Sequence, residues 1–239
     1  MLDSPGASAV EQMQMKALLA PAPAPTHRLT AVGVLLLLVL SATAVFVAPL
    51  VMPESYFWVS NVISESAAQN VHGAWIARLG FLLFGFAVLW LSISSRSMWA
   101  RGAYWFHVGF GVFMVSTAAF SHRPWVVEVP FDWFEDLLHS VTATGMGFAF
   151  AFGVLVRLLQ RRRSERYKRA FDGVAILAAV LLPVSGGLWP SVGGFTQRLM
   201  FLVAYLWYGN EAMLARRLAG RERAANALQA TPASGRGWR

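Results

Sequence analysis

The fold is decided by apolar stretches such as TAVGVLLLLVLSATAVFVAPLVM, residues 30–52, which holds no charged side chain over its 23 positions. An α-helix rises about 1.5 Å per residue, so about 20 apolar residues cross the hydrocarbon layer of a membrane. The apolar core of a secretory signal peptide is shorter, at roughly 7 to 15 residues. We therefore expect residues 30–52 to form a membrane-spanning helix.

Further apolar stretches of the same character follow along the chain. They cover residues 73–93, 103–120, 137–156, 174–189 and 199–218. Backbone polar groups within lipid must be satisfied inside each segment, and these stretches are too long for barrel strands. The sequence therefore predicts an all-α polytopic membrane protein. Its six-transmembrane-helix bundle covers residues 30–218, between flexible cytoplasmic tails at residues 1–29 and 219–239.

The composition agrees with a membrane protein and excludes several functional classes. Hydrophobic residues make up 56% of the 239-residue chain and charged residues only 13%, whereas soluble domains contain about 25% charged residues. The chain has no cysteine, which excludes disulfide scaffolds, thiolate metal sites and cysteine nucleophiles. The net charge of +8 does not indicate nucleic-acid binding, because the basic residues lie beside apolar stretches rather than on a soluble surface.

The basic residues indicate how the chain is oriented in the membrane. With both termini in the cytoplasm, seventeen of the twenty Lys and Arg side chains lie on the cytoplasmic side, as the positive-inside rule requires. Arg78, Arg123 and Arg198 are left for the outer side. The basic loop at residues 161–169 is explained by this topology, with binding of anionic headgroups as the alternative. We expect a multi-pass protein of a cell membrane, namely a bacterial inner or plasma membrane.

The sharpest polar pattern is PFDWFEDLLHS, residues 130–140, before the fourth predicted span. A proline suits the first turn of a helix, so this helix is expected to begin near the start of the pattern. Spacings of three and four residues then place Asp132, Asp136 and His139 on one face. Asp136 either orients His139 as a general base, or the acids cap the helix and His139 makes a buried hydrogen bond. A divalent metal held by these groups together with His122 is a further alternative, although their spacing matches no specific metal-ligand motif and no metal ligands are assigned.

Two more polar motifs are expected at the outer side. Ser64 and Glu65 follow the first span, and Gln197 and Arg198 open the sixth. An arginine at a helix N-terminus binds a carboxylate or phosphate ligand, or it forms a salt bridge to an acid such as Glu65 or Asp136. These alternatives are left open by the sequence.

Two polar residues fall within spans on the cytoplasmic half, His107 and Glu211. We expect Glu211 to pair with His107, or with Arg101 or Arg216 near the inner interface. His107 and His139 lie toward opposite leaflets, so together they do not ligate one haem iron. The sequence indicates no cofactor.

Three of these motifs resemble a known family. VISE at residues 62–65, D-x-x-H at residues 136–139 and QR at residues 197–198 are similar to motifs of the bacterial and archaeal six-span membrane proteins called domain of unknown function 998. The resemblance covers about residues 30–218, although Ser66 stands where the family usually has leucine. It implies a six-helix membrane architecture with a polar outer pocket, and no assigned activity. It favours as site residues Ser64, Glu65, Asp136, His139, Gln197 and Arg198.

Two hypotheses about function follow. In the first, a polar pocket in the outer leaflet binds a lipid or small amphiphile, and an enzymatic version modifies it. The catalytic residues would be His139, Asp136 and Glu65, and the ligand-binding residues Arg198, Gln197, Ser64 and Arg123. In the second, the chain is a noncatalytic subunit or scaffold of a larger membrane complex, in which small residues permit close helix packing. The expected partners are membrane lipids and, in the second case, other membrane proteins.

Overall fold

The computed structural model describes residues 26–230, which form long α-helices joined by short 3-10 helices and loops and contain no β-strand. The α-helices are α2 (Thr26–Val47), α3 (Ala74–Ser94), α4 (Arg101–Ala119), α5 (Trp133–Gln160), α6 (Arg166–Leu188) and α7 (Gly193–Ala230). The 3-10 helices are η1 (Ala48–Val51), η2 (Glu65–Ala67) and η3 (Pro190–Val192). The predicted all-α fold is confirmed. Most of the predicted tails lies outside the described residues.

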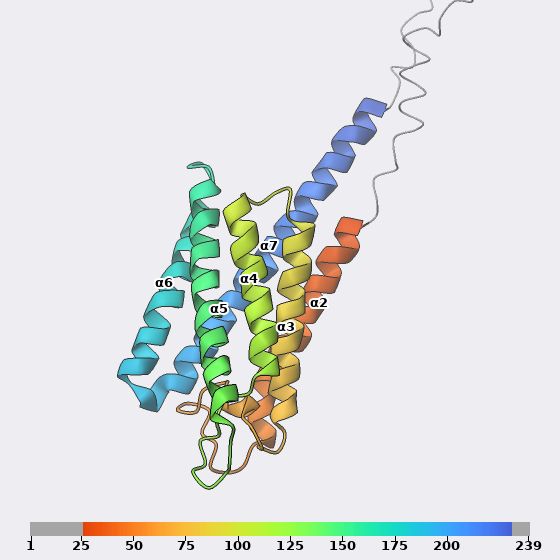
Figure 1. The fold of residues 1–239 in the computed structure, drawn as a ribbon. Coiled ribbons are helices and arrows are strands. Elements are labelled where there is room, and N and C mark those ends of the chain that lie inside the picture. Colours follow the sequence, from red (N-terminus) through yellow and green to blue (C-terminus); the bar gives the residue numbers. More distant parts are fainter. Residues whose placement is uncertain (1–25, 231–239) are drawn as a thin grey trace, which may run out of the picture.

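The six long helices form a closed ring of neighbours. Each helix from α2 to α6 packs against the next along the chain, and α7 packs against both α6 and α2. Figure 1 shows α7 crossing obliquely behind the others, while α6 diverges from α5 toward the lower end of the bundle. Close approach of α3 and α4 depends on Gly85 and Gly111, because a Cβ on either would come within 3.1 Å of the other's carbonyl oxygen.

Four of the helical segments are long and apolar enough to cross a membrane. They are Leu29–Val51, which combines α2 and η1, and the helices Ala74–Ser94, Trp133–Gln160 and Arg166–Leu188. In α6 only Asp172 and Ala175 are fully buried, and the helix exposes six large apolar side chains, those of Val174, Leu177, Val180, Leu181, Val184 and Leu188. Such a surface is stable in lipid rather than in water. The chain is therefore a multi-pass membrane protein. The six spans predicted from the sequence correspond to these four segments together with α4 and α7.

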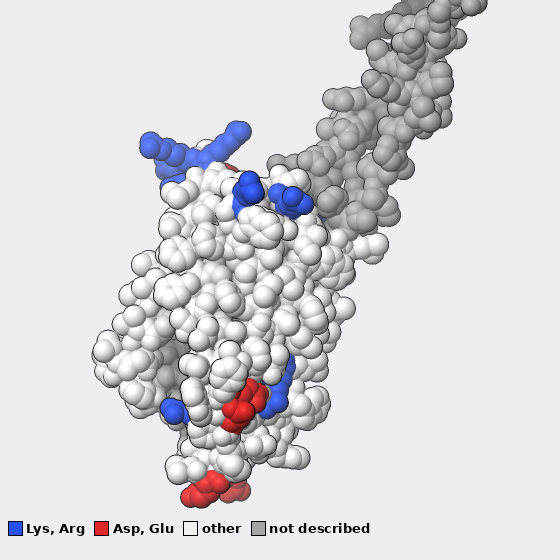
Figure 2. Space-filling model, in the orientation of Figure 1, with Lys and Arg blue, Asp and Glu red and all other residues white. Residues whose placement is uncertain are grey.

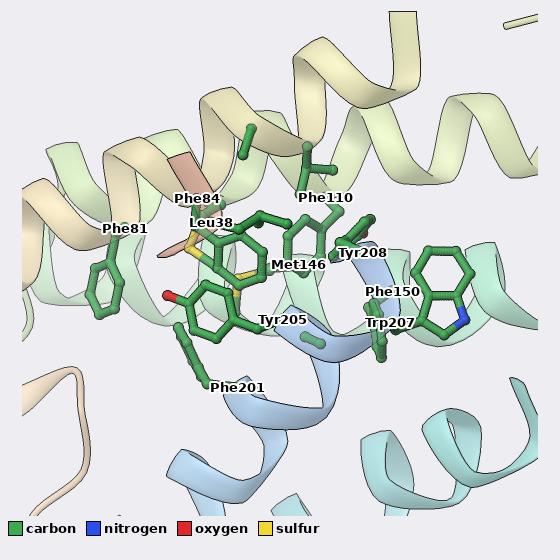
Figure 3. Close-up of a cluster of buried hydrophobic side chains, with 14 of the residues drawn as sticks. Leu38, Phe81, Phe84, Phe110, Met146, Phe150, Phe201, Tyr205, Trp207 and Tyr208 are labelled. Atoms are coloured by element: carbon green, nitrogen blue, oxygen red, sulfur yellow. The ribbon is translucent and has the colours of Figure 1, made fainter. Parts of the chain in front are cut away.

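The centre of the bundle is filled by aromatic side chains. Phe84 of α3 stacks on Tyr205 of α7 with ring centroids 4.2 Å apart, and Phe110 of α4 lies 5.1 Å from Tyr208. Figure 3 shows these rings meeting Phe150 and Trp207 between the helices. The buried hydroxyl of Ser41 contacts both Gly80 O and Tyr205 Oη, at 2.6 and 2.7 Å. This dense core joins the helices of the ring.

Three helix ends differ from the predicted spans. The helix expected to begin near Pro130 begins at Trp133, because Asp132 caps it by accepting hydrogen bonds from two backbone N–H groups. The predicted fifth span begins at Val174, whereas α6 begins at Arg166. The predicted sixth span ends at Leu218, whereas α7 continues to Ala230 through a segment rich in alanine, the residue with the highest helix propensity.

Charged side chains gather at the two ends of the bundle (Figure 2). One end, which we call the basic end, carries the loops at residues 95–100 and 161–165. The other, which we call the capped end, carries the connections at residues 48–73, 120–132 and 189–192. This separation is the one that the positive-inside rule predicts for cytoplasmic and outer sides.

Candidate functional site

The first connection, residues 48–73, folds onto the N-terminus of α7. Two backbone N–H groups of the first helical turn, those of Gly194 and Phe195, donate to Ser60 O and Val59 O at 3.1 and 2.9 Å. These bonds satisfy donors that a helix start otherwise leaves free. Gly194 is required here, because a Cβ at this position would lie 2.2 Å from Asn61 O.

Arg198 holds the same connection from inside. Its side chain is 6% exposed, and Nη1 donates to Trp58 O, Asn61 O and Gly194 O at 2.6 to 3.0 Å. Nη2 donates to Tyr56 Oη at 2.8 Å. Burial raises the pKa of Tyr56 although Arg198 opposes this effect, so its phenol keeps the proton that it donates to Val62 O.

Of the two alternatives for Arg198, the salt bridge to Glu65 or Asp136 is not formed. Its guanidinium has no carboxylate oxygen within 4.0 Å in the part of the chain that the structure describes. Glu65 instead accepts from the backbone N–H of Val62 and from Asn61 Nδ2, which fixes its own turn. The buried positive charge of Arg198 therefore faces three carbonyl oxygens, the Tyr56 hydroxyl and the rings of Tyr56 and Trp58, and none of these groups carries a full negative charge.

The other predicted residues of this group stabilise the connection. Gln197 Oε1 accepts from the backbone N–H of Ile63, so the motifs at residues 62–65 and 197–198 do meet. Ser64 is buried at the start of η2. Among the described residues, no hydrogen bond joins its hydroxyl to a histidine.

The second connection, residues 120–132, folds over the N-terminus of α5. Gln69 ties the two connections together, since its side chain bonds Ser121 O and both backbone groups of Asp132. Glu135 Oε1 accepts from the N–H of Ser121 at 2.6 Å. The acids of the predicted motif therefore hold loop backbone in place.

A small polar cluster lies beneath this connection and comprises His122, Asp136 and His139. His122 Nδ1 lies 2.6 Å from Asp136 Oδ1, in a contact that lacks hydrogen-bond alignment. The rings of His122 and His139 are 5.1 Å apart. His139 Nδ1 bonds Phe120 O at 2.8 Å, so it carries the proton, and its buried Nε2 has no partner among the described residues.

Of the two alternatives for Asp136 and His139, the geometry matches the second, in which an acid caps the helix and His139 makes a buried hydrogen bond. The two residues do lie one helical turn apart. However, His139 Nδ1 bonds the backbone carbonyl of Phe120 in the loop, and the side chain next to Asp136 is the loop residue His122. Arg123 is exposed, and only its backbone N–H contacts Asp136. Burial, and then the neighbouring His139, lower the pKa of His122, although Asp136 opposes them. A neutral imidazole beside a carboxylate can accept a proton.

The predicted site residues thus form two separate groups rather than one. Arg198, Gln197, Ser64 and Glu65 lie where the first connection meets α7, and Asp136 and His139 lie under the second connection. The groups are linked indirectly, since Tyr56 packs on Trp125 with ring centroids 5.1 Å apart. The described residues contain no group of three His, Cys, Asp or Glu side chains placed to hold a metal ion.

Two depressions lie at the capped end. An open polar one of about 540 Å³ is bordered by Arg78, Asp132 and Glu135. The other, the α2–α7 groove, has a volume of about 320 Å³ and is mostly apolar. Arg198 alone is charged among the residues that line it: Phe46, Pro49, Leu50, Trp58, Phe195, Arg198, Leu199 and Leu202.

Sequence reasoning missed a buried ionic network at the basic end. Glu211 of α7 accepts from Arg157 Nη2 at 2.7 Å and from Arg161 Nη2 at 2.5 Å, which corrects its expected pairing with His107, Arg101 or Arg216. Arg161 also binds Asp172, a residue with no exposed surface. His107 instead contacts Tyr208 Oη at 2.9 Å. The low frequency of acids within apolar segments pointed to Glu211, whereas Asp172 lies just before the predicted fifth span and no sequence signal singled it out.

Comparison with known proteins identifies the family. A family model described as "Protein of unknown function (DUF998)" matches residues 32–210. This range includes every long helix at least in part and both groups of candidate residues. Searches of curated proteins and of solved structures each found no significant match. Because the family model matches well over half of the chain, the protein belongs to the domain of unknown function 998 family.

Proposed function

We propose that this membrane protein binds an anionic amphiphile in the α2–α7 groove. The carrying observation is Arg198, which is buried at the end of an apolar groove and has no carboxylate partner among the described residues. Burying a charge is costly unless it is paired and hydrogen-bonded; Arg198 is hydrogen-bonded to carbonyl oxygens and the Tyr56 hydroxyl and lies over two aromatic rings, but it has no anionic partner among the described residues. A carboxylate or phosphate headgroup would complete its pairing.

The rest of the groove suits a hydrocarbon chain. Leu50 and Leu202, which are 81% and 43% exposed, line it together with Phe46. Trp58 and Phe195 pack edge to face with ring centroids 6.4 Å apart, and both line the groove together with Arg198. Each buried methylene contributes about 0.8 kcal/mol, so a chain in contact with this surface supplies binding energy while Arg198 selects the headgroup.

Binding is the activity that this geometry supports. Arg198 contacts neither His139 nor Asp136, and no chemical step is assigned to those residues or to Glu65. Gln197 acts through the connection that it holds in place, and Ser64 is buried at the start of η2.

A comparison of a long-chain fatty acid with the fatty alcohol of equal length tests the proposal. The two ligands differ in headgroup charge while the chain is the same, so the full-length protein in detergent should bind the acid at least about tenfold more tightly. Leu202→Trp fills the groove. If the new side chain displaces about two methylenes of the bound fatty acid, the affinity of the protein for this acid should fall about tenfold.

Leu206→Trp is the matched control, because Leu206 lies one turn further along α7, is 55% exposed and does not line the groove. The affinity of the Leu206→Trp variant for the fatty acid should stay near that of the wild-type protein. Equal binding of acid and alcohol, or equal effects of the two tryptophan variants, would contradict the proposal.

The second candidate is a subunit of a larger complex. The observation that favours it is α6, a 23-residue helix with only Asp172 and Ala175 buried, which leaves a long apolar face for another membrane helix. Native mass spectrometry after mild extraction tests it: a stable hetero-complex is expected, and free monomer alone counts against it.

A further inference from the structure

A second cavity lies at the basic end, away from the α2–α7 groove. It has a volume of about 390 Å³ where the end of α5, the 161–165 loop and α7 meet. We call it the basic cavity. Its charged lining residues are Arg157, Arg161, Arg162, Glu165, Lys168 and Arg217.

The charges around this cavity do not cancel. Five cationic side chains line it with one carboxylate, Glu165. Two further carboxylates, Glu211 and Asp172, lie buried behind Arg157 and Arg161. Counted by formal charge, the five cations exceed the three carboxylates by two.

The two innermost arginines also have unused donors. Arg157 is 8% exposed and bonds Gln160 and Glu211 through its Nη atoms, while its buried Nε has no partner within the described part of the chain. Arg161 bonds Asp172 and Glu211 through Nε and Nη2, and its Nη1 makes no hydrogen bond to another described residue. Because Arg161 lines the cavity, this Nη1 group can donate to an acceptor that lies there.

We infer that the basic cavity binds a phosphate monoester group. Such a group carries a charge of about −1.5 to −2 at pH 7, which matches the two uncompensated positive charges. Its oxygens fit the planar fork of a guanidinium. The phosphate belongs either to the headgroup of an anionic lipid in the adjoining leaflet or to a soluble molecule. This site is independent of the amphiphile proposed for the α2–α7 groove.

Two charge-matched double variants test the site in the full-length protein. Arg162→Gln with Arg217→Gln removes two exposed lining charges and leaves the buried network intact. Arg163→Gln with Arg216→Gln removes two exposed charges at the neighbouring positions, which do not line the cavity. Both variants should elute and unfold like wild type.

Two probes distinguish the source of the phosphate. Native mass spectrometry compares the binding of phosphatidic acid with that of phosphatidylcholine. Titration calorimetry in detergent measures the binding of inorganic phosphate. We expect one of these phosphate probes to bind wild type, the Arg162 and Arg217 variant to lose about tenfold or more in affinity, and the control to stay within about twofold.

Binding of phosphatidic acid that inorganic phosphate does not displace assigns the site to a lipid headgroup. Binding of inorganic phosphate without lipid assigns it to a soluble phosphate. The inference is overturned if neither probe binds, or if both double variants lose affinity equally, because the attraction is then a diffuse property of the basic end.

Discussion

The buried network at the basic end makes a quantitative prediction for Glu211→Gln. Glu211 is 2% exposed and accepts from two arginines that are each 8% exposed. Glutamine has almost the same shape but no charge, so Arg157 and Arg161 would keep only Asp172 as a counter-charge. Removing one partner of a buried ion pair costs about 3 to 5 kcal/mol, and we expect the free energy of unfolding to fall by that amount.

Glu165→Gln is the internal control. Glu165 pairs with Lys168, and their side chains are 31% and 34% exposed. Exposed ion pairs contribute about 0 to 1 kcal/mol, so this variant should unfold close to wild type. Both are measured by increasing the SDS fraction in mixed micelles and following helix content by circular dichroism. The reasoning is refuted if Glu211→Gln costs no more than Glu165→Gln.

Three further predictions concern the capped end and the orientation of the chain. Gly194→Ala should cost about 1 to 3 kcal/mol in the same assay and expose residues 52–60 to protease, because the new methyl would lie 2.2 Å from Asn61 O. Since the pKa of His122 is lowered in the folded state, stability should be constant above about pH 6.5, fall as the pH drops below it, and depend less on pH in His122→Gln. The chain has no cysteine, so in intact cells a membrane-impermeant maleimide should label Val127→Cys and not Ser164→Cys; the reverse pattern would contradict the predicted orientation.

The helices could be predicted because lipid constrains composition strongly. A segment in hydrocarbon must be helical and apolar over its whole length, and that requirement is visible in residues 30–52 without any partner. The helix ends were less predictable, since they depend on local chemistry. Asp132 caps α5 through its side chain, and α7 continues past Leu218 along residues that favour helix without being apolar.

The candidate site was predictable only in part. The spacing of Asp136 and His139 correctly places them on neighbouring turns of α5. Their partners, however, come from the 120–132 connection, which folds back over this helix, and the periodicity of the sequence does not predict that fold. His122 became the partner of Asp136 for this reason. The motifs around Glu65 and Arg198 do meet, but their side chains bind backbone groups rather than each other. Arg198 donates to carbonyl oxygens, and Glu65 accepts from the backbone N–H of Val62.

The network of Arg157, Arg161, Asp172 and Glu211 was missed for a different reason. Arginines beside apolar segments are explained fully by the positive-inside rule, so nothing in the sequence separated these two from their exposed neighbours. Glu211 lies 50 residues from Arg161 along the chain, and Asp172 lies 11 residues from Arg161 on the far side of the loop. Only packing of α5, α6 and α7 brings the four together.

The central claim, binding of an anionic amphiphile in the α2–α7 groove, is tested most directly by photo-crosslinking. A fatty acid with a diazirine in its chain is bound to the full-length protein, irradiated, and the labelled peptides are mapped by mass spectrometry. We predict labelling concentrated around Leu50, Leu199 and Leu202 and suppressed by unlabelled fatty acid. Labelling spread evenly over the exposed apolar faces, including that of α6, would contradict the account.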